Sequence, residues 1–169
     1  QVVALAGSNS HSMALRSDGT VWAWGDNSKG QLGNRSTTSS VSPLQVPGLA
    51  GVTAIAANGY YGDHSVALLK DGSVWAWGDN SFGQIGDGTT NARFTPTKVT
   101  GLPEITAISA MGSHTLALDN TGAVWIWGAW WGTTTGSGYA QVPNKVEGAA
   151  NAIKVVAGVT FNMLQLADG

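Results

Sequence analysis

The sequence contains no cysteine, which excludes disulfide bonds, thiolate metal sites and cysteine nucleophiles. Charged residues are also scarce: they make up 11% of the 169 residues, against about 25% in an ordinary soluble domain. The eight Lys and Arg residues are scattered, so no basic cluster is available for the phosphates of a nucleic acid. No apolar run approaches the roughly 18 residues that span a bilayer. We therefore expect neither nucleic-acid binding nor a membrane span.

Familiar catalytic motifs are missing as well. The sequence has no Gly-x-Ser-x-Gly elbow, no P-loop, no His-Glu-x-x-His and no dinucleotide fingerprint that opens a helix. We therefore expect a protein that is not an enzyme, with no catalytic residue and no cofactor. Scattered carboxylates could still form a pair in space, so an enzyme stays as the weaker alternative. The 43% of hydrophobic residues and the net charge of -2 are nevertheless typical of one folded domain with a core.

A pentapeptide with two tryptophans occurs three times in the chain. Val21–Gly25 reads Val-Trp-Ala-Trp-Gly, and it returns as Val74–Gly78 and, with Ile for Ala, as Val124–Gly128. A histidine lies ten residues before each valine and opens a short segment of alternating polarity; these are His11, His64 and His114. Self-similarity at a period of roughly 50 residues is the mark of a repeat architecture.

Each period contains four short segments with the alternation and the β-branched or aromatic content of strands. Asp18-Gly19 and Asp71-Gly72 stand between the second and third segments, where a tight hairpin needs residues that accept a positive φ; Thr121-Gly122 takes that place in the third copy. Four strands per period with glycine-rich turns predict an all-β fold of β-propeller blades, each with four antiparallel strands.

Two nine-residue segments carry a resemblance to a known family. Gly25–Gly33 and Gly78–Gly86 both read Gly-Asp-Asn-Ser-x-Gly-Gln-Leu/Ile-Gly, and this motif resembles the regulator of chromosome condensation repeat. The resemblance implies a seven-bladed ring, and the doubled tryptophan looks more like bacterial members of the family than like its nuclear founder. The founding member is a nucleotide-exchange factor for a small GTPase. No obvious inserted hairpin of the kind that factor is thought to use stands in this sequence, so exchange activity is not carried over.

The repeats predict a single partial propeller over residues 1–169, with copies at about 1–51, 52–104, 105–151 and, incomplete, 152–169. About three and a half of the seven implied blades are therefore present. The fourth copy is ambiguous by one residue, so either Phe161 or Asn162 stands where the other copies have histidine. Because the first residue is Gln and not Met, we expect sequence upstream of it in the natural protein.

Several residue clusters could suggest metal binding, but each has a plainer structural explanation. The three histidines would have to converge to hold a metal, and we expect instead that they hydrogen-bond neighbouring backbone. Asp26, Asn27, Asp79 and Asn80 could suggest calcium, but the terminal Glu of the 12-residue calcium loop is absent, so we expect these side chains to cap their own turns. Neither set therefore predicts a metal site. Six of the eight tryptophans stand at repeat positions, where we expect core packing.

The candidate binding residues lie where the repeat breaks. Trp130 and Trp131 replace the polar turn of the other copies, and Tyr60 with Tyr61 lies in an insertion before His64. Exposed aromatic residues on loops of a rigid scaffold are typical of binding surfaces. The alternative is that the two tryptophans fold back over the blade and replace lost packing.

The leading hypothesis is a non-catalytic propeller for protein–protein recognition, part of a larger exported or cell-surface protein. The partner is an unknown protein, and self-association through open blade edges is a further expectation. The alternatives are a carbohydrate-binding module, which would use the exposed aromatics, and a regulator of a GTPase. Fold alone does not decide among these.

Overall fold

Fourteen β-strands and no helix make up the part of the chain that the structure describes. In this computed structural model that part comprises residues 1–58, 62–133, 136–159 and 161–168. The predicted all-β class is confirmed. Within these residues, accordingly, no helix has the length and hydropathy that a membrane crossing requires.

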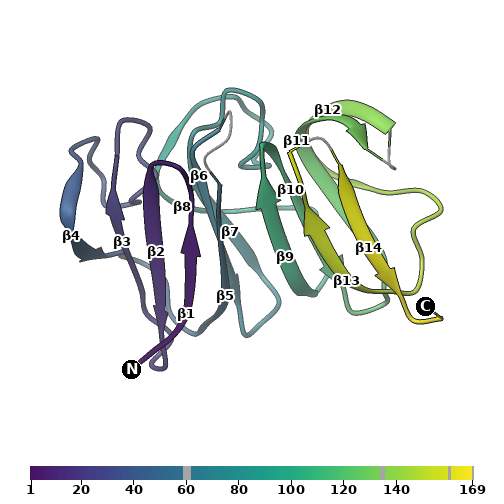
Figure 1. The fold of residues 1–169 in the computed structure, drawn as a ribbon, viewed down its shortest axis with the longest axis horizontal. Coiled ribbons are helices and arrows are strands. Elements are labelled where there is room, and N and C mark those ends of the chain that lie inside the picture. The colour runs from purple at the N-terminus through teal and green to yellow at the C-terminus, as the bar shows by residue number, and fades with distance from the viewer. Residues whose placement is uncertain (59–61, 134–135, 160, 169) are drawn as a thin grey trace.

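The strands form three four-stranded antiparallel sheets and one two-stranded sheet, in chain order (Figure 1). The first blade consists of β1 (Val2–Gly7), β2 (His11–Arg16), β3 (Val21–Gly25) and β4 (Ser40–Gln45). The second consists of β5 (Val52–Asn58), β6 (His64–Leu69), β7 (Val74–Gly78) and β8 (Arg93–Lys98). The third consists of β9 (Ile105–Met111), β10 (Ser113–Asp119), β11 (Val124–Thr133) and β12 (Gly136–Lys145). A half-blade follows, with β13 (Ala152–Ala157) and β14 (Asn162–Leu166).

An aspartate holds the tight turn between the second and third strands of each blade. Asp18 Oδ1 accepts hydrogen bonds from the amide (3.1 Å) and the hydroxyl (2.6 Å) of Thr20. Gly19 between them has a φ of 76°, which a residue with a side chain rarely adopts. In the third blade the turn is held by Asp119, which stands two residues before the position equivalent to Asp18. Its Oδ1 accepts hydrogen bonds from the amide (2.9 Å) and the hydroxyl (2.6 Å) of Thr121.

The sheets stand side by side in an arc, with the first blade at one end and the half-blade at the other (Figure 1). Their first strands contact one another in succession, β1 with β5, β5 with β9, and β9 with β13. One hydrophobic cluster lies between each neighbouring pair of sheets. A single fully or nearly fully buried tryptophan belongs to each cluster: Trp77, Trp127 and Trp130.

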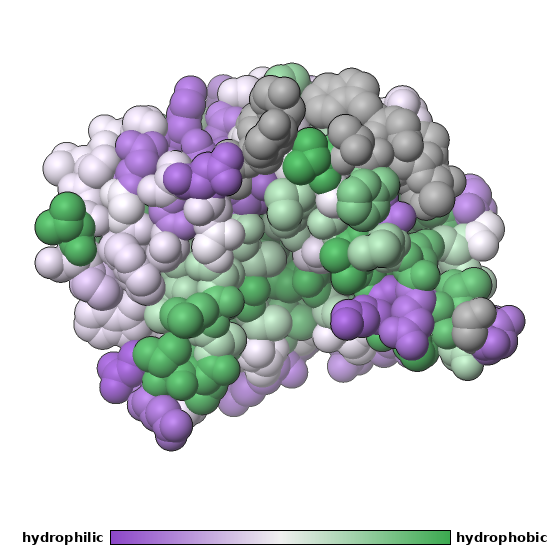
Figure 2. Space-filling model, in the orientation of Figure 1, coloured by the Kyte–Doolittle hydropathy of each residue, from purple (hydrophilic) through white to green (hydrophobic). Residues whose placement is uncertain are grey.

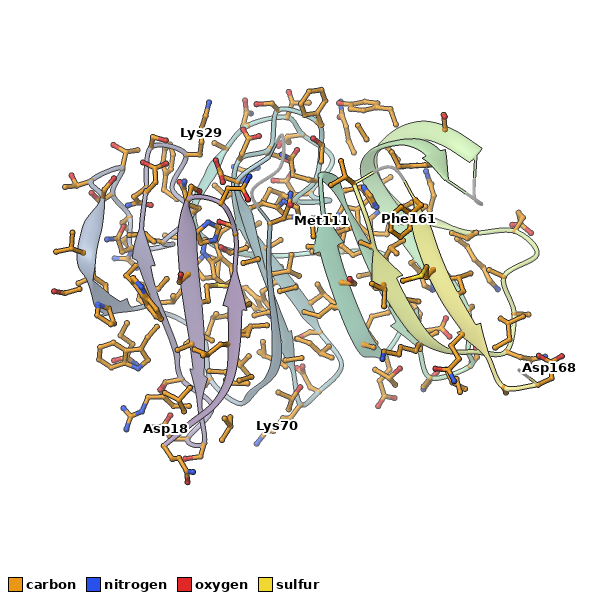
Figure 3. All side chains as sticks on the ribbon, in the orientation of Figure 1. Asp18, Lys29, Lys70, Met111, Phe161 and Asp168 are labelled. Carbon is orange, nitrogen blue, oxygen red and sulfur yellow. The ribbon has the colours of Figure 1, made fainter. Side chains whose placement is uncertain are left out.

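The structure settles the register of the fourth repeat. Ala157 pairs with Asn162 just as Ala57 pairs with Ser65 in the second blade, so Asn162 stands at the Ser/Thr position and Phe161 at the histidine position. In keeping with this register, Asp168 and Asp18 of the β2–β3 turn both lie toward the lower side of the view in Figure 3, at opposite ends of the arc.

The third blade has an extended hairpin that the sequence analysis did not expect. β11 and β12 have 10 residues each, whereas the third and fourth strands of the first two blades have 5 and 6. The segment after Gly128 continues the strand, and Trp130 pairs with Gly138. This hairpin replaces the polar loop of the other blades and inserts no residues: Gly128 pairs with Ala140, whereas Gly25 pairs with Ser40 and Gly78 with Arg93, so the connection is three residues shorter.

Candidate functional site

The repeat histidines link each blade to the next. His11 Nε2 lies 2.9 Å from Ser65 Oγ of the second blade, and that hydroxyl donates to the backbone carbonyl of Gln31 at 2.9 Å. The Trp77 indole Nε1 donates to the same carbonyl at 2.9 Å. A buried chain of hydrogen bonds thus fixes the second blade against the first.

The same chain recurs between the second and third blades. His64 Nε2 lies 2.9 Å from Thr115 Oγ1, and this hydroxyl donates to the Gln84 carbonyl at 3.1 Å. The Trp127 indole also donates to that carbonyl, at 2.9 Å. The motif residues of two successive blades therefore form a structural joint. Few of their polar groups remain free to bind a ligand.

The histidines are neutral at physiological pH. Burial lowers the pKa of His11 and of His64 to about 4, and it also lowers the pKa of His114. His64 Nδ1 makes the expected contact with neighbouring backbone, at 3.3 Å from the Gly62 carbonyl oxygen, whereas His11 Nδ1 lies 2.8 Å from Ser8 Oγ. Each Nε2 faces a side chain of the next blade; for His114 this is Asn162 Oδ1 at 2.8 Å. In the described chain no three His, Cys, Asp or Glu side chains are grouped to hold a metal ion.

The polar motif after each Trp strand is bonded within its own loop. Asp26 Oδ2 accepts from Gln31 Nε2 at 2.7 Å. Asn27 Oδ1 accepts from the Leu32 amide at 2.9 Å, and Asn27 Nδ2 donates to three oxygen atoms later in the loop. Residues 78–86 repeat this arrangement. The carboxylate and amide oxygens are therefore engaged in turn-capping bonds of the kind predicted, and they do not converge on a cation site.

Trp130, a predicted contact residue, is buried. Its exposed fraction is 8%, and it belongs to the third hydrophobic cluster. The ring lies over Gly138, where a Cβ atom would come within 2.5 Å of Trp130 Cζ2. The prediction that Trp130 presents itself outward is corrected: its ring folds back over the blade, because the paired strand offers a glycine beneath it.

The other three candidate residues fall outside what the structure describes. Tyr60 and Tyr61 lie in the segment 59–61, and the side chain of Trp131 is likewise not described, although its backbone belongs to β11. Their role as contact residues stays a prediction.

A cavity that the sequence analysis missed lies beside Trp130. Its volume is about 820 Å³, and it is bounded by β11, the end of β12 with the segment that follows, and β14. Apolar side chains dominate its wall, among them Ile126, Val146, Ala149 and Leu166. The fourth repeat could have indicated this cavity, because it contains two strand segments and no third strand beside them.

Apolar surface is exposed at both ends of the arc (Figure 2). On the first blade Leu5 is 73% exposed, whereas Val155, at the equivalent place in the half-blade, is 6% exposed. Trp24 is half-buried, whereas its equivalents Trp77 and Trp127 are fully buried. The outer face of the first blade is therefore shaped like an inter-blade surface without its neighbour.

Two models of one repeat match this chain. Both are described as the Regulator of chromosome condensation (RCC1) repeat, one over residues 71–118 and the other over residues 2–31 and 52–84. The chain belongs to the RCC1 repeat family. This confirms the resemblance that the Gly-Asp-Asn-Ser-x-Gly-Gln motif carries.

The relatives in sequence are longer than this chain. The mitochondrial RCC1 domain-containing protein RUG3 of Arabidopsis thaliana is 38% identical over 94 residues, which are 54% of this chain and 20% of the relative. The human E3 ubiquitin-protein ligase HERC2 is 42% identical over 102 residues, which are 60% of this chain and 2% of the relative. This chain thus matches only a small part of each relative.

Solved structures agree over the whole chain. Human WBSCR16 superimposes with a TM-score of 0.86 at 25% identity, and yeast RCC1 (Prp20) bound to Kap60 with 0.81 at 25% identity. Prp20p from Saccharomyces cerevisiae, described with its binding to Gsp1p and histones, gives 0.79 at 26% identity. The likeness covers 100% of this RCC1-repeat chain but only 42 to 46% of those three chains.

Proposed function

We propose that this RCC1-repeat chain is a non-catalytic protein-interaction propeller. The observation that carries the proposal is the use of the repeat's own polar residues, such as His64, Thr115 and Gln84, in joints between blades. Selectivity must then come from the segments that break the repeat. The description of yeast RCC1 bound to Kap60, and of Prp20p with Gsp1p and histones, supports a protein as the partner.

The test compares capture by the wild-type chain with capture by a variant that lacks the candidate aromatics. Immobilised wild-type protein and the variant Tyr60→Ala, Tyr61→Ala, Trp131→Ala are incubated with extract and compared by quantitative mass spectrometry. We expect a protein that the wild type retains and the variant loses. Ile153→Ala is the control, because Ile153 is an exposed apolar residue of β13 outside these segments. Equal capture by all three proteins contradicts the proposed surface.

Carbohydrate binding is the alternative that the same residues would support. If the wild type binds to a glycan array and the aromatic variant does not, the ligand of this surface is a sugar and not a protein. An unchanged, empty array leaves protein recognition as the remaining function of these loops.

Regulation of a GTPase is a second candidate, and membership of the RCC1 repeat family supports it, because the founding member is a nucleotide-exchange factor for a small GTPase. The extended hairpin of β11 and β12 is the segment of the third blade on which this activity can be tested. The test is release of labelled nucleotide from a panel of small GTPases, with and without the chain. Acceleration that disappears when residues 130–138 are replaced by the loop of residues 80–86 would support exchange activity.

We also propose that the chain is part of a larger exported or surface protein of bacterial type. The low content of charge and the doubled tryptophans support this proposal. The curated relatives named above come from a plant and an animal and lend it no support. Fractionation of cells that produce the full-length protein tests it: recovery in the cytoplasmic fraction alone contradicts an exported location.

A further inference from the structure

A small cavity lies between the first and second blades, beside their fourth strands. Its volume is about 260 Å³. Both blades have all four strands, so the cavity belongs to a completed interface. Each blade contributes three residues to its wall: Arg35, Pro47 and Gly48 from the first, and Trp75, Thr95 and Pro96 from the second.

Arg35 has a backbone conformation that is unusual for a residue with a side chain. Its φ is 64°, and its amide donates to the carbonyl of Phe94 in β8 at 2.8 Å. In the next blade Gly88 takes this place with a φ of 81°, and its amide donates to the carbonyl of Gln141 at 2.9 Å. Because glycine satisfies this backbone without strain, the fold does not account for the arginine. An unusual conformation that is kept beside a cavity points to a function of the side chain.

The guanidinium of Arg35 is available to an anion. Arg35 is exposed, and within the described part of the chain no hydrogen bond or ion pair involves its side chain. The guanidinium of Arg93, by contrast, is paired with Asp87. A guanidinium presents a planar fork of N–H donors that matches the two oxygens of a carboxylate. The cavity therefore offers a binding position for a carboxylate at its edge.

The rest of the wall is mostly apolar ring surface. Trp75 is half-buried against the hydrophobic cluster between the blades, and its Nε1 already donates to Ser73 Oγ at 3.2 Å, so it offers only the surface of its ring. Pro47 and Pro96 extend this surface. Grooves lined by aromatic side chains are typical binding sites for extended, proline-containing segments. A sugar would leave most of its hydroxyl groups unpaired, because Thr95 supplies the single side-chain hydroxyl of the wall.

The equivalent place between the second and third blades lacks this combination of residues. A tryptophan is kept there, Trp125, but Gly88 stands in place of the arginine and Thr100 in place of the proline that follows the fourth strand. Packing between two blades therefore requires neither the cation nor that proline. Both are particular to the first interface.

We propose that this cavity binds an acidic, proline-containing segment of another protein. A proline ring of the segment packs on Trp75, and the carboxylate of a neighbouring Asp or Glu accepts hydrogen bonds from Arg35. The volume lies just below the range of roughly 300–1,000 Å³ for ligand pockets, so the cavity receives a short part of an extended segment and not a folded surface. The inference rests on the proposed function only in taking a protein as the partner, and it uses none of the candidate loop aromatics.

The experiment measures binding of a labelled peptide to the 169-residue chain by fluorescence anisotropy. The peptide is Gly-Pro-Pro-Glu-Pro-Pro-Glu-Pro-Pro-Gly, and the matched peptide has Gln in place of both Glu residues. We expect saturable binding that is at least about tenfold weaker for the Gln peptide, because a charge-assisted hydrogen bond is lost. Equal binding of the two peptides, or no saturable binding, overturns the proposal. So does binding of an oligogalacturonate in place of the peptide, because the ligand would then be an acidic sugar.

Variants of the chain test the role of the guanidinium. Arg35→Gly reproduces the residue of the next blade, and we expect it to fold as stably as the wild type in circular dichroism melts and to bind the Glu peptide at least about tenfold more weakly. Arg35→Lys keeps the charge without the planar fork, so its affinity should lie between the two. Lys154→Ala is the control, because it removes a positive charge from an exposed position of β13 outside the cavity. Equal weakening by Arg35→Gly and Lys154→Ala overturns the assignment.

The NMR signals of the tryptophan indole N–H groups locate the peptide. The Trp75 signal, assigned with the variant Trp75→Phe, should shift with the same midpoint as the anisotropy. The signal of Trp125, the equivalent tryptophan of the next blade, should stay unchanged. A shift of Trp125 without a shift of Trp75 overturns the placement. Because these measurements use a defined peptide, their failure is distinguishable from a failure of the loop variant to lose a partner from extract.

Discussion

The two tryptophans of each Val-Trp-x-Trp-Gly strand have different tasks. The second is the inter-blade residue: Trp77 and Trp127 are fully buried and donate to a carbonyl of the preceding blade. The first is half-buried and donates within its own turn, as Trp75 Nε1 does to Ser73 Oγ at 3.2 Å. The sequence does not reveal this difference between the two tryptophans, because both recur at the same spacing. The difference depends on the surroundings of each residue in the stacked sheets.

Asp119 is an aspartate whose pKa is set by the hydrogen bonds of its turn. Burial by itself raises its pKa, but hydrogen bonds from Thr121, from the Trp125 indole and from the Ala123 amide outweigh that effect and lower the pKa to about 2. Because the pKa in the folded chain is below the ordinary value of 3.8, the ionised carboxylate stabilises the fold above pH 3.8. This contribution disappears as the pH falls through 2.

We therefore expect Asp119→Asn to lower the free energy of unfolding by about 2 kcal/mol at pH 7. The difference from the wild type should shrink between pH 4 and pH 2, measured by urea unfolding at each pH. Asp18→Asn is the control, since Asp18 caps the equivalent turn but is exposed. A difference that is constant over this pH range contradicts the assigned role of the charge.

The buried histidines predict a second pH dependence of stability. Here the environment disfavours the charged form of the side chain, whereas at Asp119 it favours the charged form. His11 and His64 have pKa values of about 4 in the folded chain because burial disfavours their charged form, against 6.5 when unfolded. Stability is therefore fully present above pH 6.5 and decreases as the pH falls from there through 4. NMR of the imidazole protons should show no titration of these residues between pH 5.5 and 7.5. A midpoint near 6.5 for His64 would contradict its burial in the joint.

At the scale of the strand, the extended hairpin of β11 and β12 supplies the third inter-blade tryptophan from the preceding blade. Trp77 and Trp127 come from the blade that follows, whereas Trp130 comes from the blade before. We expect Trp130→Ala to destabilise the chain by about 3–5 kcal/mol, as loss of a buried aromatic ring does, measured by thermal and urea unfolding. Tyr139→Ala on the neighbouring strand is the control, because Tyr139 is half exposed. Equal, small losses for the two variants would mean that Trp130 is not a core residue.

The repeat spacing predicted the four strands of each blade and their tight turns, because these depend on local alternation and on Asp-Gly pairs. It did not predict where the histidines bond, since Ser65 lies 54 residues after His11 and the contact exists only once two blades are stacked. The sequence left the burial of Trp130 open as one of two alternatives: the outcome depends on Gly138 in the paired strand, and the sequence Trp-Trp-Gly-Thr-Thr-Thr-Gly looks like a loop until the pairing is known. Local features could thus be predicted from the sequence, whereas contacts between strands and between blades could not.

At the scale of the whole molecule, the stacked blades form an array with two unlike ends. Each completed interface combines an apolar cluster with a buried hydrogen-bond chain, so each blade stabilises only its immediate neighbours. The likeness to yeast RCC1 covers this entire chain and 42% of that structure. The array geometry is consistent with an arc of a larger ring, and seven blades remains the prediction for the complete propeller.

The open face of the first blade predicts association of the isolated chain. Leu5 and Val41 on this face are 73% and 98% exposed, which is more apolar surface than an array normally leaves without a neighbour. Head-to-tail stacking would set one first half-blade beside another, so we expect association in a different geometry. Sedimentation velocity should show species whose size increases with concentration, and Leu5→Lys with Val41→Lys should shift them toward the monomer. Val142→Lys, on an exposed position of β12, is the control and should leave the association unchanged. A wild-type chain that stays monomeric at high concentration and binds no hydrophobic dye would show that this face is stable in water without a neighbour.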